Sequence, residues 1–405
     1  MKSELSAHGE ATVRLTNRNT GKVEHEITAR NKANLDYIAE IRSTLFSLSA
    51  YLTLFLSDYD CPPLENGLMF PMGHICGRGK YNNIANGTAM GNYSALNSIL
   101  NKQEKGLTSN TFSWDFGAAQ AVGTIRSLFL YWDTTATRYP ALMLPSVAWK
   151  GTQRFSFENK MFDNAPKTAT QYYVADFYTK EAVLHNKANT LTITGIARDV
   201  DTGHIFVYDT TVKKLYEYAS IDTDMVPENI LAEYPCSKAY VAKGLVKGKY
   251  LYFMHTSTDP LAYTQTSGTT AYLFRYDYTT DAAPEVVDSL SCIEAGYTAF
   301  MIAESCAYID DYLVYYHATG TSGYVSPVLR MVGNVPKIGF TGVYPNTANA
   351  VVQRISPNRQ VLVCGSGASA YFMPQMAISH LLLPEPIIKD NQHTLSVSYT
   401  LSIQD

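Results

Sequence analysis

The chain carries little charge, and its cysteines are not paired along the sequence. Charged residues make up 17% of its 405 residues, and the formal net charge is -4. Lys and Arg form no dense run, so the concentrated basic face of a nucleic-acid-binding protein is missing. None of the six cysteines stands in a C-x-x-C pair, which argues against a zinc ribbon. We therefore expect neither a nucleic-acid partner nor a structural metal.

A long apolar run is also missing. The most apolar stretch, residues 45–56, contains Ser and Thr and is shorter than the roughly twenty apolar residues that span a bilayer. Residues 1–13 contain no apolar segment of the signal-peptide type. We therefore expect no membrane insertion, and synthesis in the cytoplasm with reduced thiols.

Tyrosine is unusually abundant. The chain has 30 tyrosines, and hydrophobic residues make up 46% of it, which is typical of a globular protein long enough for two or three domains. Tyr suits half-buried strand positions, and it also suits surfaces that bind glycans or proteins. Packing within sheets is the simpler explanation for most of these residues.

Both ends of the chain show the alternation of a strand with one buried and one solvated face. In residues 393–403, five apolar residues alternate with Ser and Thr. Residues 11–29 contain two alternating runs separated by a turn-rich stretch, which is typical of a β-hairpin. Strands at both ends predict that the two termini close one domain with a second domain inserted between them.

The sequence therefore predicts a mainly β protein with a β-sandwich base formed by residues 1–150 and 379–405. Further strands are expected near residues 51–56, 112–116 and 124–132. One amphipathic helix is expected over residues 33–47, because apolar residues recur there at spacings of three and four. This base would serve as a mounting platform.

Residues 151–378 have a different organisation, in which similar units of strand, tight polar turn and aromatic strand recur. The turns fall at residues 201–203, 247–248, 310–311 and 357–358. Successive units lie on the order of 45 to 60 residues apart, as propeller blades do. The spacing predicts an inserted β-propeller-like domain of four or five blades, although no Trp-Asp motif marks its strand ends. A β-sandwich or an irregular β-array is the rival interpretation.

Four stretches carry a resemblance to a known family. They are residues 11–31, 87–90, 112–125 and 383–401. The most specific is 112–125, with Trp-Asp-Phe followed by Ala-Gln and Gly-Thr-Ile, although Val122 stands where Asn would be expected. In these stretches the chain resembles phage and prophage tail-associated proteins from hosts of the Gram-positive type. The resemblance covers about the first 150 residues and the last 25, and not the middle.

The resemblance implies a virion structural component of the tail tip, baseplate or fibre. Such a protein would be synthesised in the host cytoplasm, anchor by its sandwich base and display its head for attachment to the host surface. The implied partners are other phage tail or baseplate proteins, further copies of the chain in a homo-oligomer (a trimer is expected), and a host cell-surface glycan. The resemblance implies no catalytic residue and no cofactor. The alternative is a glycan-degrading depolymerase that acts on host surface polysaccharide.

Exposed tyrosines are the candidate ligand-binding residues. Tyr263, Tyr316 and Tyr324 could stack on sugar rings, because carbohydrate sites combine aromatic faces with polar groups. Packing in the sheets is the competing explanation for each of them.

No other pattern predicts a chemical site. The acidic run at residues 199–204 lacks the further ligands of a calcium loop and predicts a hairpin turn. The Gly-rich residues 365–369 match neither G-x-S-x-G nor a P-loop. His204, His255 and His317 occupy comparable unit positions and could form a metal site, but packing at strand ends is the favoured interpretation. The scattered aspartates show no pairing of the kind that glycoside hydrolysis requires, so no enzymatic activity is predicted.

Overall fold

In the computed structural model the described part of the chain is mainly β. The described residues are 6–32, 52–63, 69–81, 90–104, 107–132, 170–176, 182–209, 211–237, 244–259, 267–302, 305–309, 312–316, 324–341, 351–355, 360–364 and 377–404. The helix predicted over residues 33–47 lies outside them. No helix in the described part of the chain has the length and apolarity needed to cross a bilayer.

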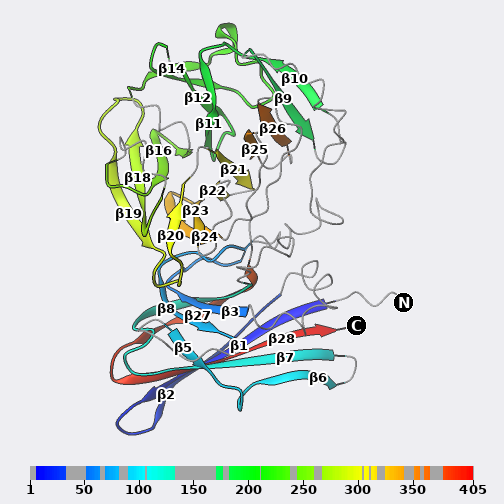
Figure 1. Ribbon diagram of the computed structural model, residues 1–405, viewed down its shortest axis with the longest axis vertical. Helices are drawn as coiled ribbons and strands as arrows, with labels where there is room; N and C mark the ends of the chain where they lie inside the picture. Colours follow the sequence, from blue (N-terminus) through cyan, green and yellow to red (C-terminus); the bar gives the residue numbers. More distant parts are fainter. Residues whose placement is uncertain are drawn as a thin grey trace. The chain divides into compact units, whose positions relative to one another are not determined.

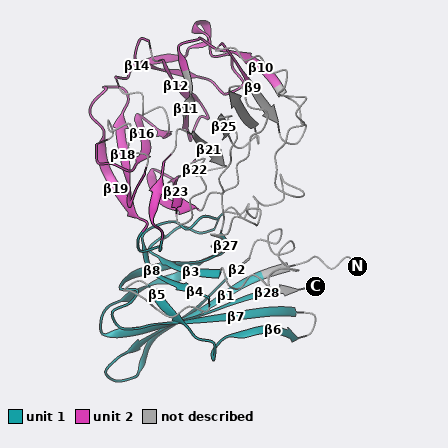
Figure 2. Cartoon of the chain, viewed as in Figure 1, with its two compact units in different colours: residues 1–150, 293–296, 375–405 teal, residues 151–292, 297–374 magenta. Residues whose placement is uncertain are grey.

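The chain forms two compact units, coloured separately in Figure 2. The first contains residues 1–150, 293–296 and 375–405, and the second contains residues 151–292 and 297–374.

The first unit is built on one ten-stranded sheet (Figure 1). Its strand order is β2-β1-β28-β7-β5-β4-β3-β8-β27, and β6 also pairs with β7. The strands are β1 (Ser6–Asn17), β2 (Val23–Lys32), β3 (Leu52–Ser57), β4 (Ile75–Lys80), β5 (Met90–Tyr93), β6 (Ile99–Glu104), β7 (Leu107–Phe116), β8 (Gly123–Trp132), β27 (Ala377–Lys389) and β28 (His393–Gln404).

The two ends of the chain pair with each other in this sheet. Strands β1 and β28 are antiparallel, and their ladder runs over twelve residue pairs. The buried face of β28 carries four core side chains that are at most 2% exposed: Leu395, Val397, Tyr399 and Leu401. On the other face Ser and Thr form cross-strand hydroxyl contacts with β7, such as Ser113 Oγ to Ser398 Oγ at 2.9 Å. The alternation in the sequence therefore predicted both the strand and its buried face correctly.

The sheet differs from the predicted sandwich because it is continuous and nearly closed into a barrel. A short parallel pairing of β4 with β5 joins its two halves, and the edge strands β2 and β27 lie side by side. Side chains link these edges: Asn31 Nδ2 donates to Ser379 Oγ at 3.1 Å and to the carbonyl of His380. Between Leu382 and Ile387 the register of β27 shifts at two prolines, which have no N–H for a ladder. A sandwich of two separate sheets was therefore the wrong expectation.

The middle of the chain leaves and re-enters this sheet at neighbouring strands. Strand β8 ends at Trp132, β27 begins at Ala377, and Tyr131 lies opposite Ala377 in the antiparallel pairing of the two strands. Residues 133–376 are therefore an insertion between two paired strands.

The described residues of the second unit form three sheets. Their strand orders are β10-β9-β26-β25, β14-β13-β12-β11-β15-β16-β18-β19 and β17-β20-β23-β22-β21, with β24 paired to β23. The strands are β9 (Gln171–Asp176), β10 (Ala182–Asn186), β11 (Leu191–Asp199), β12 (Ile205–Asp209), β13 (Lys214–Tyr218), β14 (Ala232–Pro235), β15 (Gly244–Lys247), β16 (Tyr250–His255), β17 (Ser267–Gly268), β18 (Thr270–Asp277), β19 (Glu285–Ser291), β20 (Ala299–Met301), β21 (Ser305–Ile309), β22 (Tyr312–Tyr316), β23 (Tyr324–Val332), β24 (Val335–Thr341), β25 (Val351–Ile355) and β26 (Gln360–Cys364). The first and last of these pair, since β26 lies antiparallel to β9.

The acidic run in this unit is a hairpin turn, as predicted. Asp199 Oδ1 accepts hydrogen bonds from the backbone N–H groups of Asp201 at 2.8 Å and Thr202 at 2.9 Å. Gly203 has a φ of 77°, a left-handed conformation that favours glycine. The carboxylate therefore serves the turn between β11 and β12.

Many tyrosines pack inside the second unit. Tyr208, Tyr276 and Tyr278 belong to its core cluster and are at most 6% exposed. The hydroxyl of Tyr278 donates to the carbonyl of Gly248 at 2.9 Å, which satisfies the polar end of the side chain. Sheet packing is therefore the correct explanation for these three residues.

Candidate functional site

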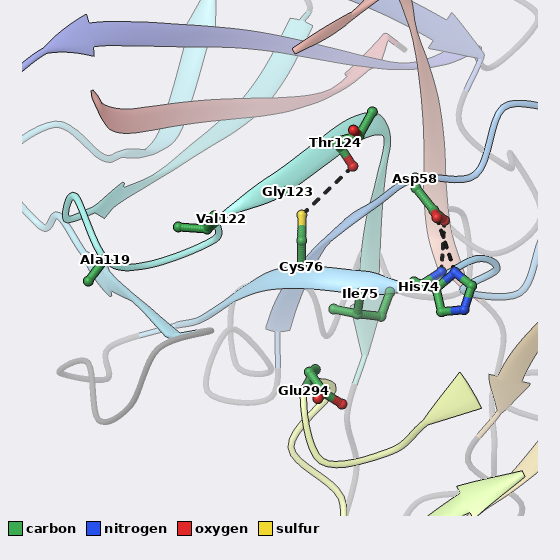
Figure 3. Close-up of a pocket in the computed structure, with 9 residues that line it drawn as sticks. All are labelled: Asp58, His74, Ile75, Cys76, Ala119, Val122, Gly123, Thr124 and Glu294. Carbon is green, nitrogen blue, oxygen red and sulfur yellow. Dashed lines mark hydrogen bonds and ion pairs between the residues drawn. The ribbon is translucent and has the colours of Figure 1, made fainter. Parts of the chain in front are cut away.

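The first unit contains a cavity of about 440 Å³ (Figure 3). Its lining includes Asp58, His74, Cys76, Val122 and Glu294. Two carboxylates and an imidazole give it a polar part, and Val122 and the thiol give it a less polar part. These groups make the cavity a candidate site for a bound ligand or a reactive residue.

In the polar part of the cavity, the side chain of Asp58 holds His74 in place, and the backbone of Gly73 lies close to the Asp58 carboxylate. Asp58 Oδ1 accepts the backbone N–H of His74 at 2.8 Å, and Asp58 Oδ2 lies 3.1 Å from His74 Nδ1. Gly73 has a φ of 78°, and a Cβ atom there would lie 2.5 Å from Asp58 Oδ1. The Asp58 carboxylate thus holds both the turn and the ring, and the histidine is oriented by local structure.

Cys76 does not supply a nucleophile to this cavity. Its thiol donates to the carbonyl of Leu56 at 3.6 Å, and Figure 3 shows it directed at Thr124, whose carbonyl lies 4.0 Å away. Burial raises the pKa of the thiol to about 12. Since the thiolate is the reactive form, this raised pKa favours the neutral thiol at neutral pH.

A second pair of residues has the spacing of a nucleophile and a base. Ser127 Oγ lies 2.9 Å from His380 Nε2, and both side chains are buried. However, Ser127 Oγ also donates to the carbonyl of Tyr59 at 2.5 Å. A hydroxyl has one proton to donate, so the imidazole must donate to Ser127 and cannot act as its base. The His380 ring stacks on Phe129 with centroids 4.3 Å apart, and both residues alternate along their strands with the core residues Leu128, Leu130 and Leu381. The contact between Ser127 and His380 is therefore structural.

Residues 112–125 and 383–401 meet at the turn between β7 and β8. Lys389, at the end of β27, is 1% exposed, and its ammonium donates to the carbonyl of Ala118 at 2.8 Å. Gln120 Oε1 accepts the N–H of Gly117 at 2.6 Å. Burial lowers the pKa of Lys389. The segments 112–125 and 383–401 are therefore joined by a buried lysine that fixes the turn.

The predicted ligand-binding tyrosines are only partly placed. Tyr263 lies outside the described residues. Tyr316 ends β22, opposite Ser305, but its side chain is outside the described part. Tyr324 begins β23 and is partly buried. Strands β22 and β23 pair, which makes Tyr316 and Tyr324 residues of neighbouring strands, and their role in binding stays a prediction.

The three candidate histidines are not brought to one site by the described residues. His204 Nδ1 lies 2.6 Å from Glu217 Oε1. His255 Nδ1 accepts the N–H of Ser257 at 3.0 Å, and burial lowers the pKa of its ring. His317 lies outside the described residues. Among the residues that the structure places, no group of three or more His, Cys, Asp or Glu residues could hold a metal ion.

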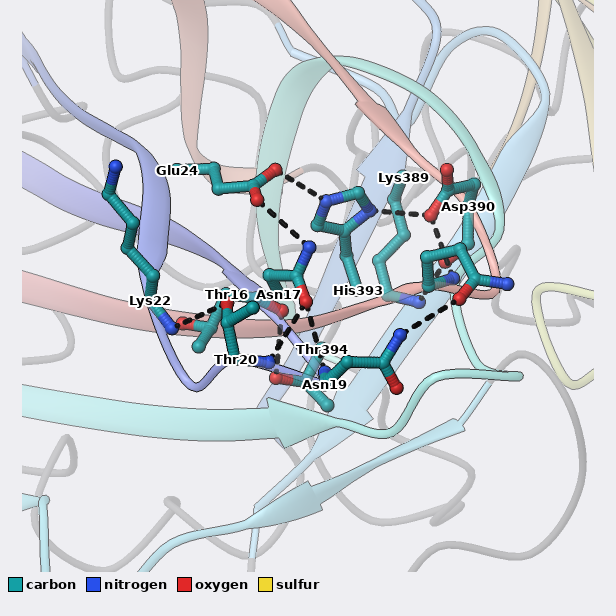
Figure 4. Close-up of polar contacts among 11 residues, drawn as sticks. Thr16, Asn17, Asn19, Thr20, Lys22, Glu24, Lys389, Asp390, His393 and Thr394 are labelled. Atoms are coloured by element: carbon teal, nitrogen blue, oxygen red, sulfur yellow. Dashed lines mark hydrogen bonds and ion pairs between the residues drawn. The ribbon is translucent and has the colours of Figure 1, made fainter.

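Sequence reasoning missed a polar cluster at one end of the barrel (Figure 4). Its centre is His393, which contacts Glu24 and Asp390. Glu24 and His393 are separated by 369 positions, and no motif surrounds either one, so the sequence contained no signal for their contact.

Comparisons of the chain with protein-family models, with curated proteins and with solved structures found no match in any of the three.

Proposed function

We propose that the chain is a virion structural component of a phage tail, located at the tip, baseplate or fibre. In this proposal the barrel formed by both termini is the anchor, and the inserted second unit is the head that is displayed for host attachment. The observation that carries the proposal is the twelve-pair ladder between β1 and β28. Because this ladder joins the two ends of the chain in one sheet, the barrel can serve as a platform, and the unit inserted into it can differ from one protein to another.

The positions of the resemblance support the same division. The specific segments 112–125 and 383–401 contribute β7, β8, β27 and β28, all strands of the barrel. Lys389 joins the two segments directly through the carbonyl of Ala118. The shared part of the family would then be the anchor, and the inserted unit would be the part that differs between members.

We further propose that the inserted unit is a four-bladed propeller. Four groups of four antiparallel strands support this interpretation: β25-β26-β9-β10, β11 to β14, β15-β16-β18-β19 and β21 to β24. In the first group, strands from the beginning and the end of the unit pair through β9 and β26. Such pairing would close a ring of blades.

The proposed partners are other tail or baseplate proteins, two further copies of the chain in a trimer, and a host cell-surface glycan. Most homo-oligomers have closed point-group symmetry, and a trimer with a three-fold axis meets that condition. Tyr263, Tyr316 and Tyr324 are the proposed contacts to the glycan.

Two measurements test the proposal on the full chain. Light scattering after size-exclusion chromatography is expected to give the mass of a trimer. Gold-labelled antibodies raised against the purified chain are expected to bind the tails of phage particles released by a strain that carries the gene. Antibody against an unrelated protein of the same strain serves as the control. A monomer in solution that is absent from the particles would contradict the proposal.

A further inference from the structure

One histidine joins the two hairpins that contain the chain ends. His393, the first residue of β28, lies between two carboxylates in Figure 4. Its Nε2 is 2.8 Å from Glu24 Oε2, and its Nδ1 is 2.5 Å from Asp390 Oδ1. Glu24 belongs to β2 of the N-terminal hairpin, whereas Asp390 lies in the turn between β27 and β28. The imidazole therefore connects segments from opposite ends of the sequence.

The backbone of the two turns is joined at the same place. The N–H of Arg18 donates to the carbonyl of Gln392 at 2.8 Å, and the N–H of Gln392 donates to Asp390 Oδ1 at 2.8 Å. Asn17 Nδ2 donates to Glu24 Oε1 at 2.9 Å. Each carboxylate thus accepts a hydrogen bond within its own hairpin and also contacts the histidine. Loss of the proton from the His393 ring will therefore affect both turns.

In the part of the chain that the structure describes, few other charged residues belong to the segments around His393. The N-terminal turn contributes Arg18 and Lys22, and the C-terminal hairpin contributes Lys389. Lys389 is engaged with the backbone carbonyls of Ala118 and Asp390. The nearby turn between β7 and β8, residues 117–122, contains no ionisable side chain. The two carboxylates are therefore the groups that contact the ring directly, and both favour its charged form.

The direction of each pKa follows from these contacts. The hydrogen bonds to Glu24 and Asp390 raise the pKa of His393 above its ordinary 6.5. The hydrogen bond from His393 lowers the pKa of Glu24 from 4.5 and that of Asp390 from 3.8. The histidine's contribution is complete below pH 6.5 and is lost as pH rises through its folded pKa, whereas the carboxylates contribute above pH 4.5 and lose their effect in stronger acid. The contact between His393 and the two carboxylates is therefore strongest between pH 4.5 and pH 6.5.

We propose that Glu24, His393 and Asp390 form a pH-sensitive clasp between the two terminal hairpins, closed in mildly acidic solution and loosened in alkaline solution. The clasp lies within the first unit. This proposal therefore does not depend on the proposed role of the chain in a phage tail. Loosening it would weaken the end of the barrel at which the two hairpin turns meet, opposite the chain termini, while the β1–β28 ladder remains in place.

Hydrogen exchange of the full chain tests the clasp at the N–H of Arg18. After correction for the intrinsic exchange rate, protection of the segment 17–22 is expected to fall about two- to fivefold between pH 6.0 and pH 8.5, the range for a partly exposed ion pair. The variant H393Q is expected to show low protection at both pH values. H25Q, on the same strand as Glu24, is the matched control and should behave as the native chain.

Imidazole NMR provides a second measurement that does not require H393Q to fold well. The titration midpoint of His393 is expected above 6.5 in the native chain, and E24Q, which keeps a hydrogen-bonding side chain without the charge, is expected to lower it. A midpoint at or below 6.5 would overturn the clasp. Equal protection of the segment 17–22 at both pH values in the native chain would overturn it as well.

Discussion

The ammonium group of Lys389 donates a hydrogen bond to the carbonyl of Ala118 at 2.8 Å, in a site where the lysine is 1% exposed. Lys389 lies opposite Gly123, the first residue of β8. One side chain thus fixes the connection between β7 and β8 from a strand near the other end of the sequence. The C-terminal segment of the chain therefore stabilises the conformation of the turn between β7 and β8.

Replacing this lysine tests that dependence. K389M keeps the aliphatic stem but leaves the carbonyl of Ala118 without its donor, and we expect the free energy of unfolding to fall by about 1–3 kcal/mol, the typical cost of an unsatisfied buried group. Urea denaturation followed by tryptophan fluorescence measures the change. K22M, at an exposed lysine of the N-terminal turn, is the control and should differ from the native chain by less than about 0.5 kcal/mol. Equal losses in both variants would contradict the role of Lys389.

A glycine at the barrel seam leads to a second prediction. A Cβ atom at Gly9 would lie 2.6 Å from Asn31 Oδ1 and 2.7 Å from Ser379 Oγ, the two residues that link β2 to β27. We expect G9A to displace this link and to destabilise the chain by about 1–3 kcal/mol, as overpacking of a filled core does. Thermal unfolding measures the effect. G117A is the matched control, because a Cβ atom there meets nothing closer than 3.4 Å.

The buried serine and histidine give a prediction that separates structure from catalysis. S127A removes a hydroxyl that contacts both the carbonyl of Tyr59 and the ring of His380, so we expect a loss of about 1–3 kcal/mol in unfolding free energy. Because the proton of Ser127 is donated to the carbonyl of Tyr59, we expect Ser127 not to act as a nucleophile in ester hydrolysis. Hydrolysis of a chromogenic ester by the native chain that disappears in S127A would contradict this assignment.

The raised pKa of Cys76 predicts a thiol that is protected while the chain is folded. Since its pKa is about 12, the thiolate fraction at pH 8 is expected to be roughly a thousandfold below that of an ordinary cysteine. Iodoacetamide labelling followed by mass spectrometry should modify Cys76 only after denaturation. Rapid labelling of this residue in the folded chain, at the rate measured in denaturant, would contradict the burial of the sulfur.

The local parts of this fold could be predicted from the sequence because strand periodicity is a local property. The alternation in β28 predicted which of its residues are buried, and the turn at Asp199 was identified from its own residues. The closure of the barrel was not predictable, because it depends on Asn31 meeting Ser379 and His380 across more than three hundred positions. The cluster around His393 was missed for the same reason. No short motif encodes a contact between lone polar residues so far apart.

The glycan contacts are the last prediction, and the second unit provides a matched control for it. If Tyr324 stacks on a sugar ring, Y324A in the full chain should weaken binding to host cells by about two- to tenfold, the value of one aromatic contact, and Y263A and Y316A should have similar effects. Tyr250 is the control, because Lys249 Nζ and Arg275 Cζ lie 5.0 and 4.9 Å from its ring centroid and leave less of the ring free for a sugar. Flow cytometry with the fluorescently labelled chain measures binding. If Y250A weakens binding as much as the other three variants, the tyrosines act through the stability of the sheets and not through contact with a glycan.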